Sequence, residues 1–135
     1  MDNKILVHKH LIVRAEIKKP PQSESYFEGW LKDFIESINM KILIGPFCKY
    51  SDMPGNEGLT GGAVIETSHV VMHCWDRVEH PIMQLDVCSC SEFDPIKVCE
   101  KVKEDFGATK IEYKFLDREH NLTELQSDKF LKSQN

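Results

Sequence analysis

Near the middle of the chain stand residues 58–75, GLTGGAVIETSHVVMHCW. Two short apolar runs, at 61–66 and 69–75, flank the polar pair Thr67-Ser68. Runs of this length and composition are typical of strands, so we predict two strands here or one interrupted strand. Strands that follow one another through short turns pair antiparallel, and this stretch therefore favours an antiparallel sheet.

The segments on either side of residues 58–75 predict the rest of the sheet. Apolar patterning indicates further strands at 5–17, 42–50, 82–90 and 110–116. The segment that begins at Asp117 is polar with little periodicity, so we expect a short helix or disorder there. The predicted division is a domain over residues 1–118 and a polar C-terminal tail over residues 119–135.

Two helices are predicted between these strands. The first carries one apolar stripe at positions 27, 30, 31, 34, 35 and 38, after the capping-box pattern Ser25-x-x-Glu28. The second begins at Asp94-Pro95 and ends at Gly107. Because each helix has one apolar stripe, the expected fold class is α+β: a two-layer sandwich with a mainly antiparallel sheet and two helices on one face. The other face of the sheet must be polar or packed against another subunit.

Composition narrows the class of protein. The chain has 135 residues, of which 41% are hydrophobic and 29% charged, which suits one globular domain. Its net charge of -5 gives no electrostatic footprint for nucleic acid. The longest apolar runs are too short to span a bilayer, and the N-terminus lacks the unbroken apolar stretch of a signal peptide. We therefore expect a cytoplasmic protein with neither nucleic acid nor membrane as partner.

The chain has five cysteines, an odd number without a preceding secretory signal, so a disulfide framework is not expected. Cys88 and Cys90 form a C-x-C, with His73 and His80 upstream. A zinc site from these four residues is conceivable, but the spacing matches no finger or ribbon, and we predict no metal site.

Residue types around Ser68 allow two interpretations. A serine, two histidines and a downstream cysteine suit a nucleophile with a base. The same residues also suit a hydroxyl at a turn and two ordinary histidines, and residue types alone favour this second interpretation.

A series of short motifs changes that balance. They are, in chain order, His10-Leu11, Gly58-Leu59-Thr60-Gly61, Ser68-His69, His73-Cys74-Trp75, Leu85-Asp86-Val87 followed by Cys90, and Asp94-Pro95. The series resembles the prokaryotic short form of the S-adenosylmethionine decarboxylase family, over roughly residues 8–118. Several separated motifs in one order are more specific than any of them alone.

The resemblance implies a self-processing enzyme. Ser68 Oγ would attack the carbonyl of Thr67, the chain would break between Thr67 and Ser68, and a pyruvoyl group would remain where Ser68 was. That cofactor would form a Schiff base with S-adenosylmethionine and act as the electron sink for its decarboxylation, in polyamine and spermidine biosynthesis. The family's fold further implies a homodimer that forms through sheet faces.

The resemblance also implies roles for individual side chains. His73 matches the processing histidine, and imidazole suits proton transfer near neutral pH. Cys90 matches the acid that reprotonates the substrate carbon. Thr60 stands where the family has a serine that assists processing. Tyr50 lies near the family's aromatic that stacks on adenine, and Trp75 matches another aromatic of the pocket.

Two positions depart from the family pattern. Thr67 replaces the glutamate that usually precedes the processed serine. The Pro-Glu that follows the family's tryptophan is replaced by Asp76-Arg77-Val78-Glu79, and that glutamate is associated with ribose recognition. Asp76 and Glu79 are therefore the candidate substrate-binding residues there. The same chemistry on arginine or ornithine stays open, as does an unprocessed relative that binds a ligand or regulates a partner.

Overall fold

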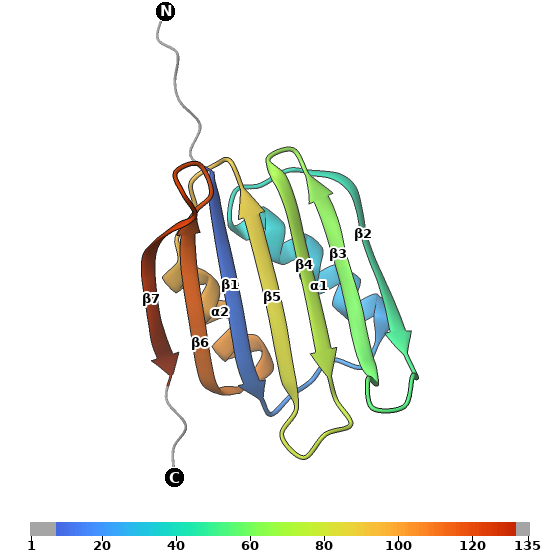
Figure 1. Ribbon diagram of the computed structural model, residues 1–135. Coiled ribbons are helices and arrows are strands. Elements are labelled where there is room, and N and C mark those ends of the chain that lie inside the picture. The colour runs from blue at the N-terminus through green and yellow to red at the C-terminus, as the bar shows by residue number, and fades with distance from the viewer. Residues whose placement is uncertain (1–7, 132–135) are drawn as a thin grey trace, which may run out of the picture.

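The computed structural model describes residues 8–131 and contains seven strands and two helices in that range (Figure 1). In chain order the elements are β1 (Lys9–Ile17), α1 (Glu24–Ser37), β2 (Ile42–Ser51), β3 (Gly58–Ile65), β4 (Ser68–Trp75), β5 (Ile82–Ser89), α2 (Pro95–Phe106), β6 (Ala108–Asp117) and β7 (Thr123–Leu131). Residues 5–7 of the first predicted strand lie outside the described range.

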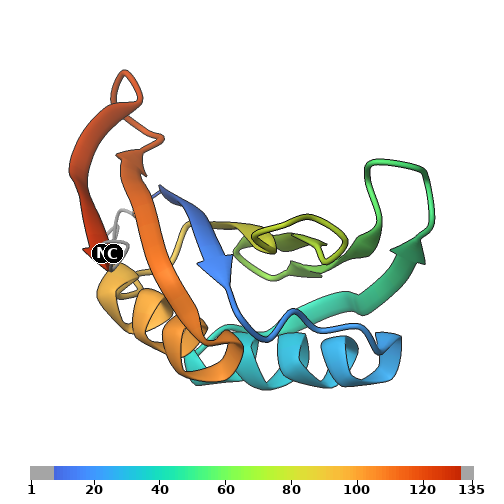
Figure 2. The ribbon, with the colours of Figure 1, turned by 90° about the horizontal axis from the view of Figure 1, so that it is seen from below.

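The strands form one antiparallel sheet in the order β2-β3-β4-β5-β1-β6-β7. Both helices cover the same face of this sheet, with α1 against β2 and β3, and α2 against β6 and β1 (Figure 2). The predicted two-layer α+β sandwich is therefore confirmed. We call the face without helices the open face.

Helix α1 buries the predicted stripe, with Phe27, Leu31, Phe34 and Ile35 fully enclosed between the helix and the sheet. The predicted cap at Ser25 is wrong. The helix begins two residues earlier than that cap implies, at Glu24, and the N-cap Ser23 accepts a hydrogen bond of 3.2 Å at its Oγ from the Tyr26 N–H. Ser25 lies inside the first turn, where its backbone is already helical and cannot serve as an N-cap.

Helix α2 has both predicted ends. Asp94 Oδ1 accepts a hydrogen bond of 2.9 Å from the Ile96 N–H, and Pro95 follows as the first helical residue. Gly107 ends the helix in the left-handed conformation, with φ of 62°. A residue without a side chain adopts that conformation at little cost, so the chain can turn directly into β6.

Residues 58–75 form two strands that make a tight hairpin. β3 and β4 pair antiparallel from Thr60 opposite His73 to Ile65 opposite Ser68. The turn between them holds only Glu66 and Thr67, so the Thr67–Ser68 peptide bond stands where the turn enters β4.

The prediction of a short helix or disorder after Asp117 is wrong. Residues 123–131 form β7, which pairs antiparallel with β6 and extends the same sheet at its edge. Polar residues give little periodicity in such a position, because an edge strand can leave its side chains in water while its backbone bonds the neighbour. Residues 121–126 are all exposed.

The open face carries a mixture of polar and apolar side chains. Ile12, Phe47 and Val64 point there and are 41%, 56% and 40% exposed. His69 and His73 of β4 lie on the same face, since alternate residues of a strand share a side. No helix in residues 8–131 is long and apolar enough to cross a membrane.

Candidate active site

Strand β4 brings candidate residues to both of its ends. Thr67 and Ser68 stand where the strand begins, and His73 and Trp75 stand where it finishes. We call the first the cleavage end, after the scission that the sequence analysis predicts there, and the second the histidine end.

At the cleavage end the carbonyl of Thr67 is held by the backbone of Cys90. The Cys90 N–H donates a hydrogen bond of 2.9 Å to the Thr67 oxygen. This contact follows from register, because Ser68 pairs with Ser89 across β4 and β5, and the chain continues from there to Cys90. The bond places a donor on the carbonyl that precedes Ser68.

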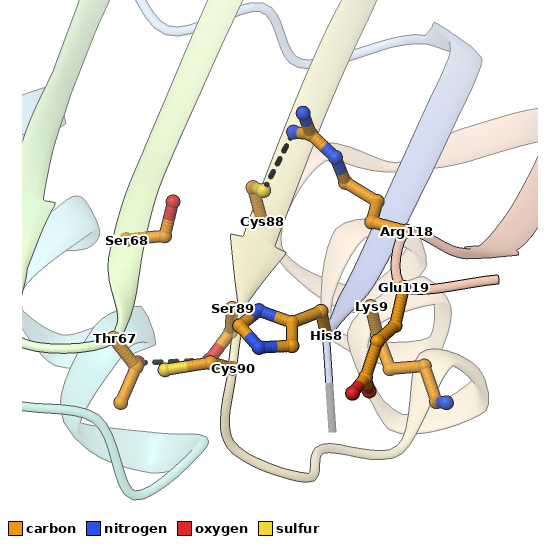
Figure 3. A pocket seen from close by; sticks show the side chains of 9 residues that line it. All are labelled: His8, Lys9, Thr67, Ser68, Cys88, Ser89, Cys90, Arg118 and Glu119. Atoms are coloured by element: carbon orange, nitrogen blue, oxygen red, sulfur yellow. Dashed lines mark hydrogen bonds between the residues drawn. The ribbon is translucent and has the colours of Figure 1, made fainter. Parts of the chain in front are cut away.

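A second set of bonds fixes the Thr67 side chain. Ser89 is 2% exposed, and its hydroxyl donates to Thr67 Oγ1 at 2.8 Å (Figure 3). The Ser91 N–H donates in turn to Ser89 Oγ at 3.0 Å. Because a buried hydroxyl with satisfied bonds has few alternative orientations, this network orients the residue whose carbonyl Cys90 holds.

Ser68 has an unusual backbone. Its φ is 142°, in the region that only glycine occupies readily, so the residue is strained. The Ser68 hydroxyl lies 3.1 Å from Nδ1 of His69, the next residue. The strained residue therefore carries a hydroxyl that is already paired with an imidazole.

Ser68 and Cys90 open into one cavity of about 440 Å³ (Figure 3). The cavity is lined by His8, Lys9, Thr67, Ser68, Cys88, Ser89, Cys90, Arg118 and Glu119. Arg118 follows β6 and donates a hydrogen bond of 3.1 Å from Nη1 to Cys88 Sγ. The cavity thus combines three hydroxyls, two thiols, three basic groups and one carboxylate.

Cysteines elsewhere have a different character. Burial raises the pKa of the Cys48 thiol to about 11 and that of Cys99 to about 12. Burial likewise raises the pKa of Cys74. These three side chains pack in the core as neutral thiols, whereas Cys90 is partly exposed at the cavity.

At the histidine end, Thr60 and His73 form a pair. Thr60 Oγ1 lies 3.1 Å from His73 Nδ1, as their direct opposition in β3 and β4 allows. The rings of His73 and Trp75 lie 6.0 Å apart, and Trp75 Nε1 donates to Asn56 Oδ1 at 2.7 Å. With Cys74 and Gln84 these residues line a second cavity of about 300 Å³.

The two ends do not meet within one chain. Ser68 and His73 are five residues apart on a continuous strand, which separates them by about 16 Å at the usual rise per residue. The structure therefore brings Thr67, Ser68 and Cys90 together, and Thr60, His73 and Trp75 together, but not the first group with the second.

Tyr50 and Asp76 form a third pair beside the histidine end. The Tyr50 hydroxyl donates to Asp76 Oδ1 at 2.8 Å, and this bond is the main cause of a raised pKa for Tyr50. The other oxygen, Asp76 Oδ2, is buried without a hydrogen-bond partner among the described residues. Glu79 is exposed in the turn between β4 and β5.

The conceivable zinc ligands are divided between the two ends. Cys88 and Cys90 line the cleavage cavity, whereas His73 lines the other one. Within the described residues, the three potential ligands that do gather are Asp117, Glu119 and His120, in the exposed connection between β6 and β7.

Sequence reasoning missed three residues of the cleavage end: His69, Ser89 and Arg118. His69 is part of the Ser68-His69 motif, but its contact with the Ser68 hydroxyl depends on a backbone conformation that sequence patterns do not predict. Ser89 and Arg118 reach the site through strand pairing, so only the register of β5 and β6 could have identified them.

Comparison with known proteins identifies the family. The profile of the S-adenosylmethionine decarboxylase family matches residues 10–119. The S-adenosylmethionine decarboxylase proenzyme of Clostridium botulinum strain Hall is 29% identical over 94 residues, which cover 69% of this chain and 76% of the relative. The proenzyme of strain Langeland is 28% identical over the same length. The chain belongs to the S-adenosylmethionine decarboxylase family, a family of carboxy-lyases.

Proposed function

We propose that this protein is a self-processing decarboxylase of S-adenosylmethionine that breaks its own chain between Thr67 and Ser68. The observation that carries the proposal is the cleavage end itself. A strained serine, with φ of 142°, directly follows a carbonyl that accepts a 2.9 Å hydrogen bond from the Cys90 N–H.

The hydrogen bond to Thr67 supports attack on its carbonyl carbon. When Ser68 Oγ adds to that carbon, negative charge develops on the Thr67 oxygen. A backbone donor that is already 2.9 Å away stabilises this charge without reorganisation. Since the donor is backbone, it does not depend on the side chain at position 90.

The strain at Ser68 supports scission of the bond before it. A non-glycine residue held at such a φ stores about 1–3 kcal/mol. Breaking the Thr67–Ser68 bond frees the backbone on the amino side of Ser68 and releases that energy. The strain thus favours a product in which Ser68 becomes a chain end.

The residues present fit a pyruvoyl group derived from Ser68. The required serine is there, and it opens into a cavity of about 440 Å³ that has room beside it for a substrate. Such a group supplies an electron sink for the carbanion that remains when CO₂ leaves a substrate amine. Cys90 lines the same cavity, and we assign its thiol the task of returning a proton to the substrate carbon.

A second copy of the chain would complete this site. His73 and Thr60 lie about 16 Å from Ser68 along one chain, yet both ends of β4 border the same open face. A twofold axis parallel to that face, running across the strands, would stack the two open faces and set the histidine end of each copy over the cleavage end of the other. We propose a homodimer of this kind, supported by the exposed Ile12, Phe47 and Val64 on the open face.

In this dimer His73 of the partner subunit serves the later proton transfers of processing. After Ser68 carries Thr67 as an ester, loss of the Ser68 α-proton expels the Thr67 carboxylate. An imidazole that already has Thr60 at 3.1 Å is held in a fixed orientation for that proton.

One observation favours a second substrate class, arginine or ornithine. One oxygen of Asp76 already accepts from Tyr50, and Glu79 is exposed in a turn, where it offers a ribose no enclosed carboxylate. A cationic amino acid without a ribose would not need that ligand.

Release of labelled CO₂ tests the function and the substrate together. Purified protein, incubated with carboxyl-labelled S-adenosylmethionine, arginine or ornithine, should release CO₂ from S-adenosylmethionine, and Ser68→Ala should release none. Release from arginine or ornithine instead would assign the second class. No release from any of the three, by protein that stays uncleaved, would indicate an unprocessed relative that binds a ligand or regulates a partner.

A further inference from the structure

We infer that His69, and not His73, is the base that starts self-cleavage by taking the proton of the Ser68 hydroxyl. The inference rests on the proposed function and assigns its first step to a residue. His69 Nδ1 lies 3.1 Å from Ser68 Oγ, within hydrogen-bond distance.

The contact depends on the distorted backbone at Ser68. In a regular strand, the side chains of neighbouring residues point to opposite faces and do not meet. The φ of 142° at Ser68 breaks that alternation and lets its hydroxyl approach the next side chain. The strain that favours scission therefore also delivers the nucleophile to a base.

The position of the His69 ring is set by its neighbours. His69 lies opposite Val64 of β3 and opposite Cys88 of β5, and it is half-buried on the open face. In this position its Nδ1 is directed at Ser68 Oγ, 3.1 Å away. For Nδ1 to accept the proton, the neutral ring must carry its hydrogen on Nε2.

Other groups near Ser68 are poorer bases. His73 is about 16 Å away along β4 and pairs with Thr60. Lys9 and Arg118 are cations and have no lone pair to offer. His8 and Glu119 line the same cavity, but within the described residues the hydrogen bond of the Ser68 hydroxyl is to His69.

The first step balances without a co-reactant. The Ser68 hydroxyl proton moves to His69 Nδ1 while Oγ forms a bond to the Thr67 carbonyl carbon. The carbon–nitrogen bond between Thr67 and Ser68 then breaks, and the imidazolium returns the proton to the Ser68 nitrogen. The products are an ester and a free amine, and His69 is neutral again, so the step consumes nothing.

Charged groups lie on both sides of His69. On the β5 side His69 lies opposite Cys88, whose sulfur accepts a hydrogen bond from Arg118. Cys88 in turn lies opposite His10 of β1, which pairs with Asp86 at 2.9 Å. On the other side Val64 of β3 carries no charge, but Lys49 of β2 lines the same cavity as His69. A protonated ring has no lone pair on Nδ1, so we expect ester formation to need His69 in its neutral form.

The test compares His69→Asn with His73→Asn. Asparagine places an oxygen near the Nδ1 position and can still accept the Ser68 hydrogen bond, but it cannot take the proton. Both variants are followed by intact mass over time, with and without hydroxylamine, which cuts esters and leaves peptide bonds whole. His120→Asn, in the exposed connection after β6, is the control for loss of an imidazole elsewhere.

The two variants should stop at different steps of processing, His69→Asn before ester formation and His73→Asn after it. His69→Asn should remain a full-length, hydroxylamine-resistant amide, with ester formation slowed about 10²–10⁴-fold and its pH dependence lost. His73→Asn should accumulate a full-length ester that hydroxylamine cuts at residue 67. His69→Ala, should the asparagine variant fold poorly, should regain cleavage when imidazole is added, which a purely structural role would not give.

Two results would overturn the inference, and they are distinguishable. If His69→Asn forms the ester at the rate and with the pH dependence of the parent protein, His69 is not the base. The proposed function would not be affected by that result. A parent protein that never cleaves would remove both.

Discussion

The two ends of β4 differ in which part of the chain carries the chemistry. At the cleavage end the functional features belong to the backbone: a positive φ at Ser68 and a carbonyl bonded by the Cys90 N–H. At the histidine end the strand is regular, and the features are side chains, Thr60, His73 and Trp75, on the open face. In the proposed dimer, the first, ester-forming step therefore depends on the cleavage end of one copy, and the later proton transfer of processing depends on the histidine end of the other.

Mixing two inactive variants gives the largest expected effect. Ser68→Ala lacks the nucleophile and His73→Asn lacks the later proton acceptor, so neither alone should be cleaved. In a mixed dimer the intact Ser68 meets His73 of the partner subunit. Cleavage should return in the His73→Asn chains only, up to about half of them for random pairing of equal amounts. The measurement is intact mass after the two are refolded together.

If verified mixed dimers show no cleavage, Ser68 and His73 must act within the same chain. The proposal that the two ends of β4 meet across the dimer would then be wrong. The control experiment uses Ser25→Ala in place of Ser68→Ala, because Ser25 is a serine on the exposed start of α1. It should be cleaved by itself.

Replacing the Cys90 side chain should separate cleavage from turnover. The Thr67 carbonyl is bonded by the Cys90 backbone, so Cys90→Ala should still cleave. Its decarboxylation rate should fall about 10²-fold or more, because the proton donor to the substrate carbon is gone. Mass and CO₂ release are measured on one sample. Full turnover by this variant would remove Cys90 from the role.

A charge on the open face should weaken the dimer. Phe47 is 56% exposed there, and Phe47→Asp would bury a carboxylate in the interface. The dimer dissociation constant should rise about 10-fold or more, as sedimentation over a range of concentrations would show. Tyr26→Asp, 51% exposed on α1, is the matched control on the covered side. Equal dissociation constants for the two variants would argue against a dimer through this face.

The smallest effect is expected at Tyr50. Its pKa is raised chiefly by the hydrogen bond to Asp76, so the contact stabilises the fold while the phenol is protonated. That contribution is present below the unfolded pKa of about 10 and is lost as pH rises through the folded pKa. Tyr50→Phe should lower Tm slightly at pH 7, with a smaller difference at high pH. A difference that grows with pH would contradict this assignment.

The fold could be predicted where local chemistry determines it. The apolar stripe of α1, the Asp94 cap and the Gly107 stop each act within a few residues, and each is confirmed. β7 was missed because it is an edge strand with exposed polar residues, and its existence depends on the neighbouring β6 rather than on its own pattern.

The sequence motifs named candidate site residues but not their arrangement in space. Motifs indicated Ser68, Cys90, Thr60 and His73, and the structure sorts them into two groups. Once Ser68 and His73 lie on one strand, their spacing of five residues is enough to separate them. The contact between Ser68 and His69 could not be foreseen, because it rests on a φ that sequence patterns disfavour.

The most direct test of the account is the mass of the purified, incubated protein. The account predicts two fragments, residues 1–67 and residues 68–135. The second should be lighter by one ammonia than a fragment that begins with serine, and it should lack a free amino terminus. A single unbroken chain, or a second fragment that still begins with serine, would contradict the central claim that Ser68 breaks the bond before it.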